Sequence, residues 1–398
     1  MLINRPGAYA ETPGRLDTNA GALDSIRRGD FSLGVVTCSP GPESYSLFGH
    51  TALRYCNAET GEDVVFNYGL FDFSSSHFVW RFMLGQTDYV VGAQPTAHFL
   101  NDYESQRRGV TEQVLNLTPV EGDRLLRFLL WNIQPENRTY RYNYLTKNCS
   151  TCVLDAIRAA LDGTLQYPDG VGCRTYRGEL HRFTGDHPWA QLGNDLLLGV
   201  DCDTLLSPRA VPFLPYTMAA FLDTACVLGT DGQRARLVGE TRVLVPLNAP
   251  ERADAGFPLR PSAVAWLFAG LCLCLAVWEW RRGRVVWPVD VVLFFVQGLA
   301  GCLVLFMVCF SEHPTVDSNW QALLLNPLPL LCLPWVIVRA RKQGKCLYHP
   351  LNAIYLSAFL IFSLFTKQQF AEIIIPLSLG IAVRSASHWI NTYRRHAA

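Results

Sequence analysis

Beyond Pro261 the sequence becomes a series of long apolar segments joined by short polar links, and this change constrains the fold more than any other feature. Each segment is near the ~20 residues that a helix needs to cross the hydrocarbon core of a bilayer. We predict five membrane-spanning helices, at residues 261–280, 287–310, 322–338, 351–365 and 370–383. The last two segments are short, and a helical hairpin that dips into the membrane is the alternative for them.

The links between these segments set the predicted orientation. Lys and Arg residues gather on the first link, the third link and the C-terminal tail: Arg281, Arg282, Arg284, Arg339, Arg341, Lys342, Lys345, Arg384, Arg394 and Arg395. The second link, residues 311–321, carries acidic residues and no Lys or Arg. Because basic links face the cytoplasm, we expect the C-terminus there and the N-terminal region outside the cytoplasm.

The residues before the apolar region mix polar and apolar side chains and predict a separate folded domain. We divide the chain into a leader at 1–30, an extracytoplasmic domain at 31–256 and a transmembrane domain at 257–398. The leader is polar, is expected to be mobile, and lacks the apolar stretch of a signal peptide. Translocation then relies on the first span, or the native N-terminus has been replaced or removed. The formal net charge of +0 argues against a nucleic-acid partner, which would favour a basic surface.

Strands come first in the extracytoplasmic domain, and helices follow. β-branched and aromatic residues bounded by Gly and Pro predict strands at 31–37, 51–55, 64–68 and 112–117. Apolar residues at helical spacing predict an amphipathic helix at 121–132 and a second helix directly after Cys149. This order indicates an α+β fold, with an irregular region from about 172 to 248.

The run TKNCSTC at 146–152 places Cys149 where extended chain turns into a helix. The partial positive charge of a helix N-terminus stabilises a thiolate and lowers the pKa of the thiol. Cys149 is therefore a candidate nucleophile. Two alternatives stay open at this point: a C-x-x-C redox pair with Cys152, and a structural disulfide or simply a buried sulfur.

A catalytic cysteine needs a base and a third group that orients the base. His50 follows a glycine and enters a predicted strand, so its side chain can point into a cleft while the sheet holds its backbone. Asn67 on the next strand is the predicted orienter, because an amide oxygen accepts from one imidazole N–H and leaves the other nitrogen for the thiol. Asp72 is the second candidate for that role.

Further polar residues are candidates for supporting roles. Asn148, Tyr142 and Tyr144 can donate hydrogen bonds to an oxyanion, together with the backbone N–H groups at the helix start. Glu312 and His313 on the second link form a candidate site at the membrane edge, with a solvated loop as the alternative.

No cofactor or metal site is expected. The sequence has no P-loop, no G-x-G-x-x-G motif and no G-x-S-x-G motif. Cys173, His181, His187 and Cys202 are spaced too loosely for a zinc site.

A linked set of motifs resembles the Lnb family, whose members have an Lnb-type N-terminal periplasmic domain followed by membrane spans. The motifs are FGHTALR at 48–54, FNYG at 66–69 with FDF at 71–73, PENR at 135–138, YNY at 142–144 with NCST at 148–151, EHP at 312–314 and NPL at 326–328. By position in these motifs, the resemblance implies that Cys149 is the nucleophile, His50 the base and Asn67 the third member, with Arg54 supporting the site. The order of His before Cys also resembles the permuted papain-like superfamily, which includes lecithin retinol acyltransferase.

The resemblance implies a function for the whole chain, because the Lnb family includes lipoprotein N-acyltransferases. We expect a multi-pass protein of the bacterial inner membrane, with its catalytic domain in the periplasm. A fatty acyl chain would pass from a phospholipid, through a thioester on Cys149, to the N-terminal amine of a diacylglyceryl-cysteine lipoprotein. Two rivals stay open: a cysteine hydrolase that acts on peptide, amide or phospholipid, and a non-enzymatic membrane chaperone or adaptor.

Overall fold

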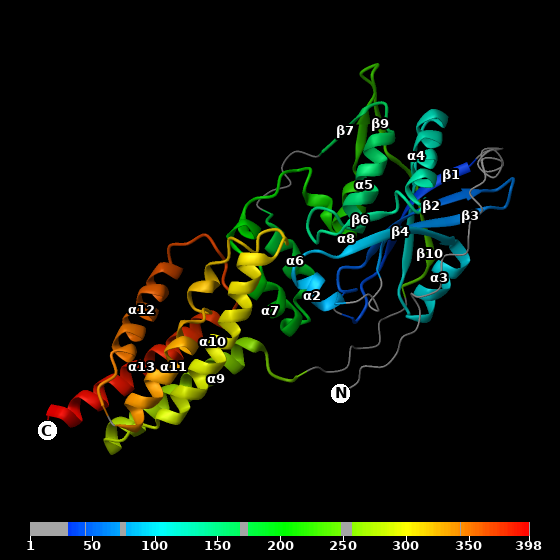
Figure 1. Cartoon of the computed structure of the whole chain (residues 1–398). Helices are drawn as coiled ribbons and strands as arrows, with labels where there is room; N and C mark the ends of the chain where they lie inside the picture. Colours follow the sequence, from blue (N-terminus) through cyan, green and yellow to red (C-terminus); the bar gives the residue numbers. More distant parts are fainter. Residues whose placement is uncertain are drawn as a thin grey trace. The chain divides into compact units, whose positions relative to one another are not determined.

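The computed structural model of the chain describes residues 31–43, 45–71, 77–167, 174–247, 257–342 and 344–397. A sheet-rich N-terminal part precedes a helical C-terminal part (Figure 1), which confirms the predicted α+β class. The chain forms two compact units. The first contains the described residues up to Arg174 and those from Leu205 to 247, and the second contains Thr175–Thr204 and the described residues from 257 onward. The predicted leader at 1–30 lies outside the described residues.

A seven-stranded antiparallel sheet organises the first unit, with the strand order β10-β5-β1-β2-β3-β4-β6. The strands are β1 (Phe31–Cys38), β2 (His50–Asn57), β3 (Asp63–Leu70), β4 (Asp88–Pro95), β5 (Val110–Leu115), β6 (Thr139–Arg141) and β10 (Val238–Val245). The four predicted strands correspond to β1, β2, β3 and β5. Because β1, β2 and β3 follow one another as antiparallel neighbours, the start of β2 lies beside the end of β3.

Helices cover both faces of this sheet. Ala52 and Leu53 are adjacent on β2 and therefore point to opposite faces. Leu53 joins the buried cluster under α4 (Pro119–Asn132) and α5 (Cys149–Ala160), whereas Ala52 joins the cluster under α3 (Thr96–Ser105). The predicted helix at 121–132 is confirmed as α4, which begins with a capping box between Thr118 and Glu121.

Smaller elements complete the first unit. A short helix, α2 (Phe78–Met83), lies between β3 and β4 in the chain. A three-stranded sheet has the order β7 (Thr164–Gln166), β8 (Cys226–Leu228), β9 (Arg234–Arg236). The two further helices are η2 (Val211–Phe213) and α8 (Pro215–Leu222). Part of the region that we predicted to be irregular is therefore regular.

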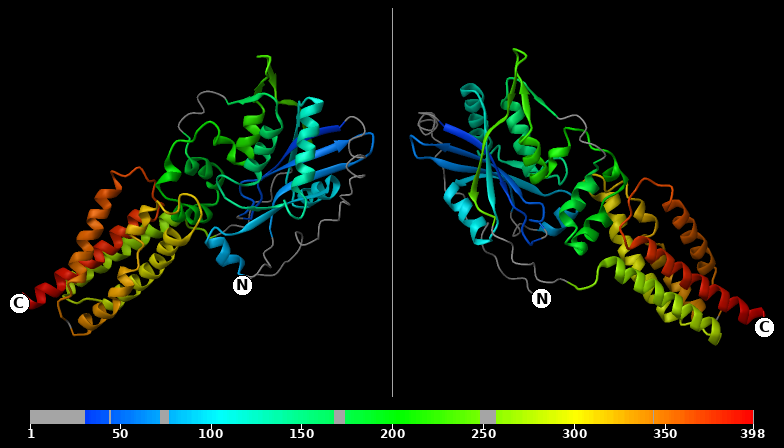
Figure 2. Two further views of the ribbon diagram at one scale, coloured as in Figure 1. Left: turned by 45° about the horizontal axis from the view of Figure 1, so that its top comes forward. Right: turned by 180° about the vertical axis from the view of Figure 1, so that it is seen from behind.

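The second unit is helical. Its elements are α6 (Tyr176–Thr184), α7 (Pro188–Leu197), η1 (Val200–Asp203), α9 (Pro261–Arg282), α10 (Trp287–Phe310), η3 (Trp320–Leu323), α11 (Leu328–Arg341), α12 (Tyr348–Ser363) and α13 (Ile374–Ala397). Helix α13 packs against both α9 and α12, and α10 packs against α11; Figure 2 shows these helices from two further sides. The segment Thr175–Thr204 belongs to this unit by its contacts, whereas the sequence-based division placed it in the first domain.

Three described segments are long and apolar enough to cross a membrane: Pro261–Arg282, Trp287–Phe310 and Trp320–Arg341. They correspond to the first three predicted spans. The fourth and fifth predicted spans are the 16-residue α12 and the 24-residue α13, which buries polar residues such as Arg384 and His388. The count of five spans stays a prediction.

Candidate active site

Cys149 is the first residue of α5, as the sequence predicts. Asn148 caps the helix: its side-chain oxygen accepts from the backbone N–H groups of Ser150 and Thr151 at 2.9 and 3.1 Å. The side-chain amide of Asn148 also donates to the carbonyl oxygens of Tyr144 and Phe213, at 2.9 and 3.0 Å. Four hydrogen bonds therefore fix the helix end that carries the thiol.

His50 is the first residue of β2, beside a bend that only glycine fits well. Gly49 has φ +80°, and a Cβ atom at this position would lie 2.6 Å from the carbonyl oxygen of Cys38. His50 itself pairs with Cys38 in the ladder between β2 and β1. The glycine therefore lets the chain enter the sheet so that His50 stands at its edge.

Asn67 lies on β3 and holds the His50 ring. The Nε2 atom of His50 lies 2.6 Å from the Oδ1 atom of Asn67, within hydrogen-bond distance. An amide oxygen can only accept, so Nε2 carries the proton in this pair. The other ring nitrogen, Nδ1, is left for the thiol.

The side chains of His50 and Cys149 are hydrogen-bonded, and the two groups shift each other's pKa. Burial opposes ionisation of the Cys149 thiol, but the charge and the hydrogen bond of His50 outweigh burial and lower its pKa. Burial likewise opposes the imidazolium, but the thiolate and the hydrogen bonds to Cys149 and Asn67 raise the pKa of His50. Both shifts favour a thiolate–imidazolium pair.

Two further contacts join β2 to α5 at this point. The backbone N–H of Thr51 hydrogen-bonds to the Cys149 sulfur and contributes to the lowered pKa of the thiol. The hydroxyl groups of Thr51 and Ser150 lie 3.0 Å apart in the buried interior. Sequence reasoning missed both residues, although each directly follows a predicted catalytic residue. His50 and Cys149 are each half-buried.

Tyr142 and Tyr144 lie close to the cysteine. Burial, followed by neighbouring phenols and the Cys149 thiolate, raises the pKa of Tyr142 well above its ordinary value. Tyr142 is therefore a neutral phenol, the form in which its O–H can donate. Tyr144 makes an edge contact with Phe48, with ring centroids 5.8 Å apart. Asn148 already uses both side-chain N–H groups, so a direct bond to an oxyanion would require one of them to be released.

The remaining predicted residues lie elsewhere or outside the described chain. Arg54 forms ion pairs with Asp63 at 2.6 Å and Glu112 at 2.9 Å, four residues along β2 from His50. This separation corresponds to about 13 Å, so Arg54 supports the sheet rather than the thiol. Asp72 lies outside the described residues. Glu312 and His313 lie in the second unit between α10 and η3, with Glu312 exposed and His313 half-buried.

Cys152 lies one turn after Cys149 on α5. Burial raises the pKa of the Cys152 thiol to about 12, so this thiol does not ionise at neutral pH. Neither cysteine is in a disulfide in the part of the chain that the structure describes. The contrast between a lowered pKa at Cys149 and a raised pKa at Cys152 favours a lone nucleophile over a redox pair.

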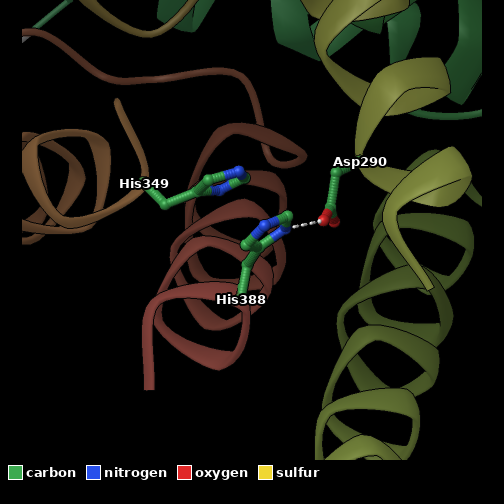
Figure 3. A group of neighbouring side chains, drawn as sticks. All are labelled: Asp290, His349 and His388. Carbon is green, nitrogen blue, oxygen red and sulfur yellow. Dashed lines mark hydrogen bonds and ion pairs between the residues drawn. The ribbon is translucent and has the colours of Figure 1, made fainter. Parts of the chain in front are cut away.

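The second unit contains a buried polar cluster that sequence reasoning missed. Arg384 of α13 pairs with Glu279 of α9 at 2.7 Å and with Asp290 of α10 at 2.8 Å, and all three side chains are fully buried. His388 places Nδ1 2.8 Å from the second oxygen of Asp290. His349 of α12 stacks on His388 with ring centroids 3.6 Å apart (Figure 3).

Asp290, His349 and His388 are of the residue types that ligate transition metals, and their ligand atoms lie within 4.8 Å of one another. A ring nitrogen binds an ion through a lone pair in the plane of the ring. Two stacked rings therefore cannot both direct a lone pair at one ion unless one ring turns. In the described arrangement, Asp290 instead accepts from Arg384 and hydrogen-bonds with His388.

Comparison with known proteins places the chain in a family. Neither the search of curated proteins nor the search of solved structures found a match. Residues 24–179 match the model of the Lnb N-terminal periplasmic domain, and residues 252–396 match the model of the Lnb transmembrane domain. The chain thus belongs to the Lnb family and is a membrane protein with a periplasmic N-terminal domain.

Proposed function

We propose that this protein is a lipoprotein N-acyltransferase of the bacterial inner membrane. The observation that carries the proposal is the position of His50, hydrogen-bonded to the Cys149 thiol on one side and to Asn67 on the other. This is the arrangement of nucleophile, base and orienter that covalent acyl transfer needs. Membership of the Lnb family supports the choice of an acyltransferase.

In the first half-reaction, the Cys149 thiolate attacks the carbonyl carbon of a phospholipid ester. A carbon–sulfur bond forms, the ester carbon–oxygen bond breaks, and the His50 imidazolium gives its proton to the departing lysophospholipid oxygen. The product is an acyl thioester on Cys149. The backbone N–H groups at the start of α5 and the Tyr142 hydroxyl are the proposed donors to the oxyanion.

In the second half-reaction, the N-terminal amine of a diacylglyceryl-cysteine lipoprotein attacks the thioester. A carbon–nitrogen bond forms, the carbon–sulfur bond breaks, and neutral His50 takes the proton that the amine loses. The thiolate–imidazolium pair is thereby restored. Asn67 keeps the ring in one orientation through both steps, because its oxygen accepts from Nε2 throughout.

The proposal includes the architecture around the site. The catalytic core is a permuted papain-like domain, in which the strands that carry His50 and Asn67 precede the helix that carries Cys149. The transmembrane helices cross the inner membrane several times, and their basic links and the C-terminus face the cytoplasm. Both substrates are anchored in lipid, which accounts for a catalytic domain joined to membrane helices.

The test is the intact mass of the full-length protein after incubation with phosphatidylethanolamine vesicles. We expect a fatty-acyl adduct that hydroxylamine removes and that is lost in Cys149→Ser. The Cys152→Ser variant is the matched control and should keep the adduct. Absence of an adduct from the wild-type protein contradicts the proposal.

A second measurement separates transfer from hydrolysis. The acylated protein is mixed with a diacylated lipopeptide that has a free N-terminal amine. A transferase moves the acyl chain to the lipopeptide, whereas a hydrolase releases free fatty acid at the same rate with and without it. A chaperone or adaptor gives neither product, and cells that carry Cys149→Ser would then still make N-acylated lipoproteins.

A further inference from the structure

Helix α2 exposes apolar side chains: Val79 is 71% exposed, Trp80 53% and Phe82 43%. Arg81, whose side chain is 41% exposed, bonds to the carbonyl oxygen of Gln86 at 3.1 Å and to Asp88 at 3.1 Å. A helix that faces water usually pairs its apolar side with the protein and leaves its charges outside.

The segment that carries α2 begins and ends at an aromatic stack. It leaves the sheet after Phe71, whose ring stacks on Tyr89 with centroids 4.9 Å apart. It returns at Thr87, whose carbonyl oxygen accepts from the backbone N–H of Tyr142 at 3.2 Å. Tyr89 stacks on Tyr142 in turn, with centroids 4.1 Å apart. The first end is therefore held by the ring of Phe71 and the second by the backbone of Tyr142.

The chain beside this stack leads to the reactive thiol. Asn143, which follows Tyr142, pairs with Lys147, two residues before Cys149. The Cys149 thiolate also contributes to the raised pKa of Tyr142. Helix α2 ends at Met83, four residues before Thr87, so its exposed apolar residues lie on the segment that Thr87 joins to Tyr142.

We propose that α2 contacts the bilayer from which the acyl donor comes. Val79, Trp80 and Phe82 enter the lipid, and the donor phospholipid reaches Cys149 from the membrane surface beside α2. Trp and Phe are suited to this contact because aromatic side chains are favoured at the membrane interface. The inference rests on the proposed function for its acyl substrate, but the lipid contact of α2 is independent of catalysis.

The first test measures lipid contact directly. The photoreactive amino acid p-benzoylphenylalanine replaces Trp80 in the full-length protein, which is placed in phosphatidylethanolamine nanodiscs and irradiated. The matched control carries the same residue at Trp131 of α4, which is 55% exposed. We expect phospholipid adducts at position 80 and a much smaller amount at position 131. Equal amounts at both positions, or none at position 80, would overturn the proposal.

The second test separates the lipid contact of α2 from the chemical step at Cys149. The double variant Trp80→Ser, Phe82→Ser should form the acyl-enzyme about tenfold more slowly from phosphatidylethanolamine, because apolar contact is lost. The rate with the water-soluble ester p-nitrophenyl butyrate should not change, and Trp131→Ser should change neither rate. Equal losses with both donors would assign α2 a purely structural role and refute the proposal. Failure of the wild-type protein to form an acyl-enzyme with any donor would refute the proposed function but leave the crosslinking result standing.

Discussion

The bond between His50 and Asn67 gives a quantitative prediction for the variant Asn67→Ala. Hydrogen bonds to charged groups contribute about 1.5–3 kcal/mol. His50 is half-buried, so water can enter the space left by the amide, and we take the lower end of this range. One pKa unit corresponds to about 1.4 kcal/mol. The variant should therefore lower the pKa of His50 by about one unit, which corresponds to a factor of about ten in the equilibrium constant for forming the ion pair.

The sign of the change follows from the two pKa shifts. The reactive thiolate–imidazolium pair exists above the lowered pKa of Cys149 and below the raised pKa of His50. Loss of Asn67 makes the imidazolium less favourable, so the pKa of His50 falls and the pKa of Cys149 rises. The acidic limb of thiol reactivity should move to higher pH by about one unit, and at a pH on that limb acylation should slow by about tenfold.

The assay is the rate of alkylation of Cys149 by iodoacetamide between pH 4 and 9 (about the range over which the pair forms and is lost), followed by peptide mass spectrometry. Asn67→Asp keeps an acceptor and should not move the acidic limb to higher pH. Asn57→Ala removes a buried amide at the far end of β2 and should leave the limb unchanged even if stability falls. An acidic limb that does not move in Asn67→Ala would refute the role given to Asn67.

Three further outcomes are expected. At pH 7, iodoacetamide should label Cys149 far faster than Cys152, because burial raises the pKa of Cys152 to about 12; equal labelling would contradict the contrast between the two thiols. Arg54→Met should lower the free energy of unfolding by about 3–5 kcal/mol, because it leaves a buried carboxylate without its cation; the pH profile of Cys149 alkylation should stay as in the wild type. Glu279→Ala should lower the free energy of unfolding of the protein in detergent by about 3–5 kcal/mol. The double variant Glu279→Met, Arg384→Met should recover most of that loss. No recovery would mean that the single variant does not act through the buried ion pair.

The position of Cys149 could be predicted from the sequence because its determinants are local. Asn148 and Thr151 supply the cap, and the helix follows directly. The pairing of His50 with Asn67 could also be predicted, since two successive strands that form an antiparallel pair bring the start of the first beside the end of the second. The bond from Thr51 to the thiol depends on how α5 approaches β2, and residue types alone do not give that approach.

Other features could not be predicted because their partners are distant or their sequences atypical. Strand β4 contains Gly92 and ends at Pro95, residues that are depleted in strands. Strand β6 has three residues, too few for an alternating pattern. Arg54 was assigned to the site from its motif, but its partner Glu112 lies 58 residues away on β5. The exposed apolar residues of α2 could not be predicted either, because a six-residue helix is too short for a periodic pattern.

The buried ion pair of Arg384 and Glu279 has a consequence for the assembly of the helical unit. Helix α13 follows α9 and α10 in the chain, and it is not among the described segments that are long and apolar enough to cross a membrane. Glu279 lies near the end of α9 and Asp290 in the first turn of α10, so the arginine of α13 meets its two carboxylates at one end of these helices. Until α13 arrives, α9 and α10 hold the carboxylates of Glu279 and Asp290 without their cation, and α13 in turn needs those carboxylates to bury its arginine. We therefore expect α9 and α10 to stay within reach of α13 until it has been synthesised, because its arginine pairs with carboxylates that precede it by more than ninety residues.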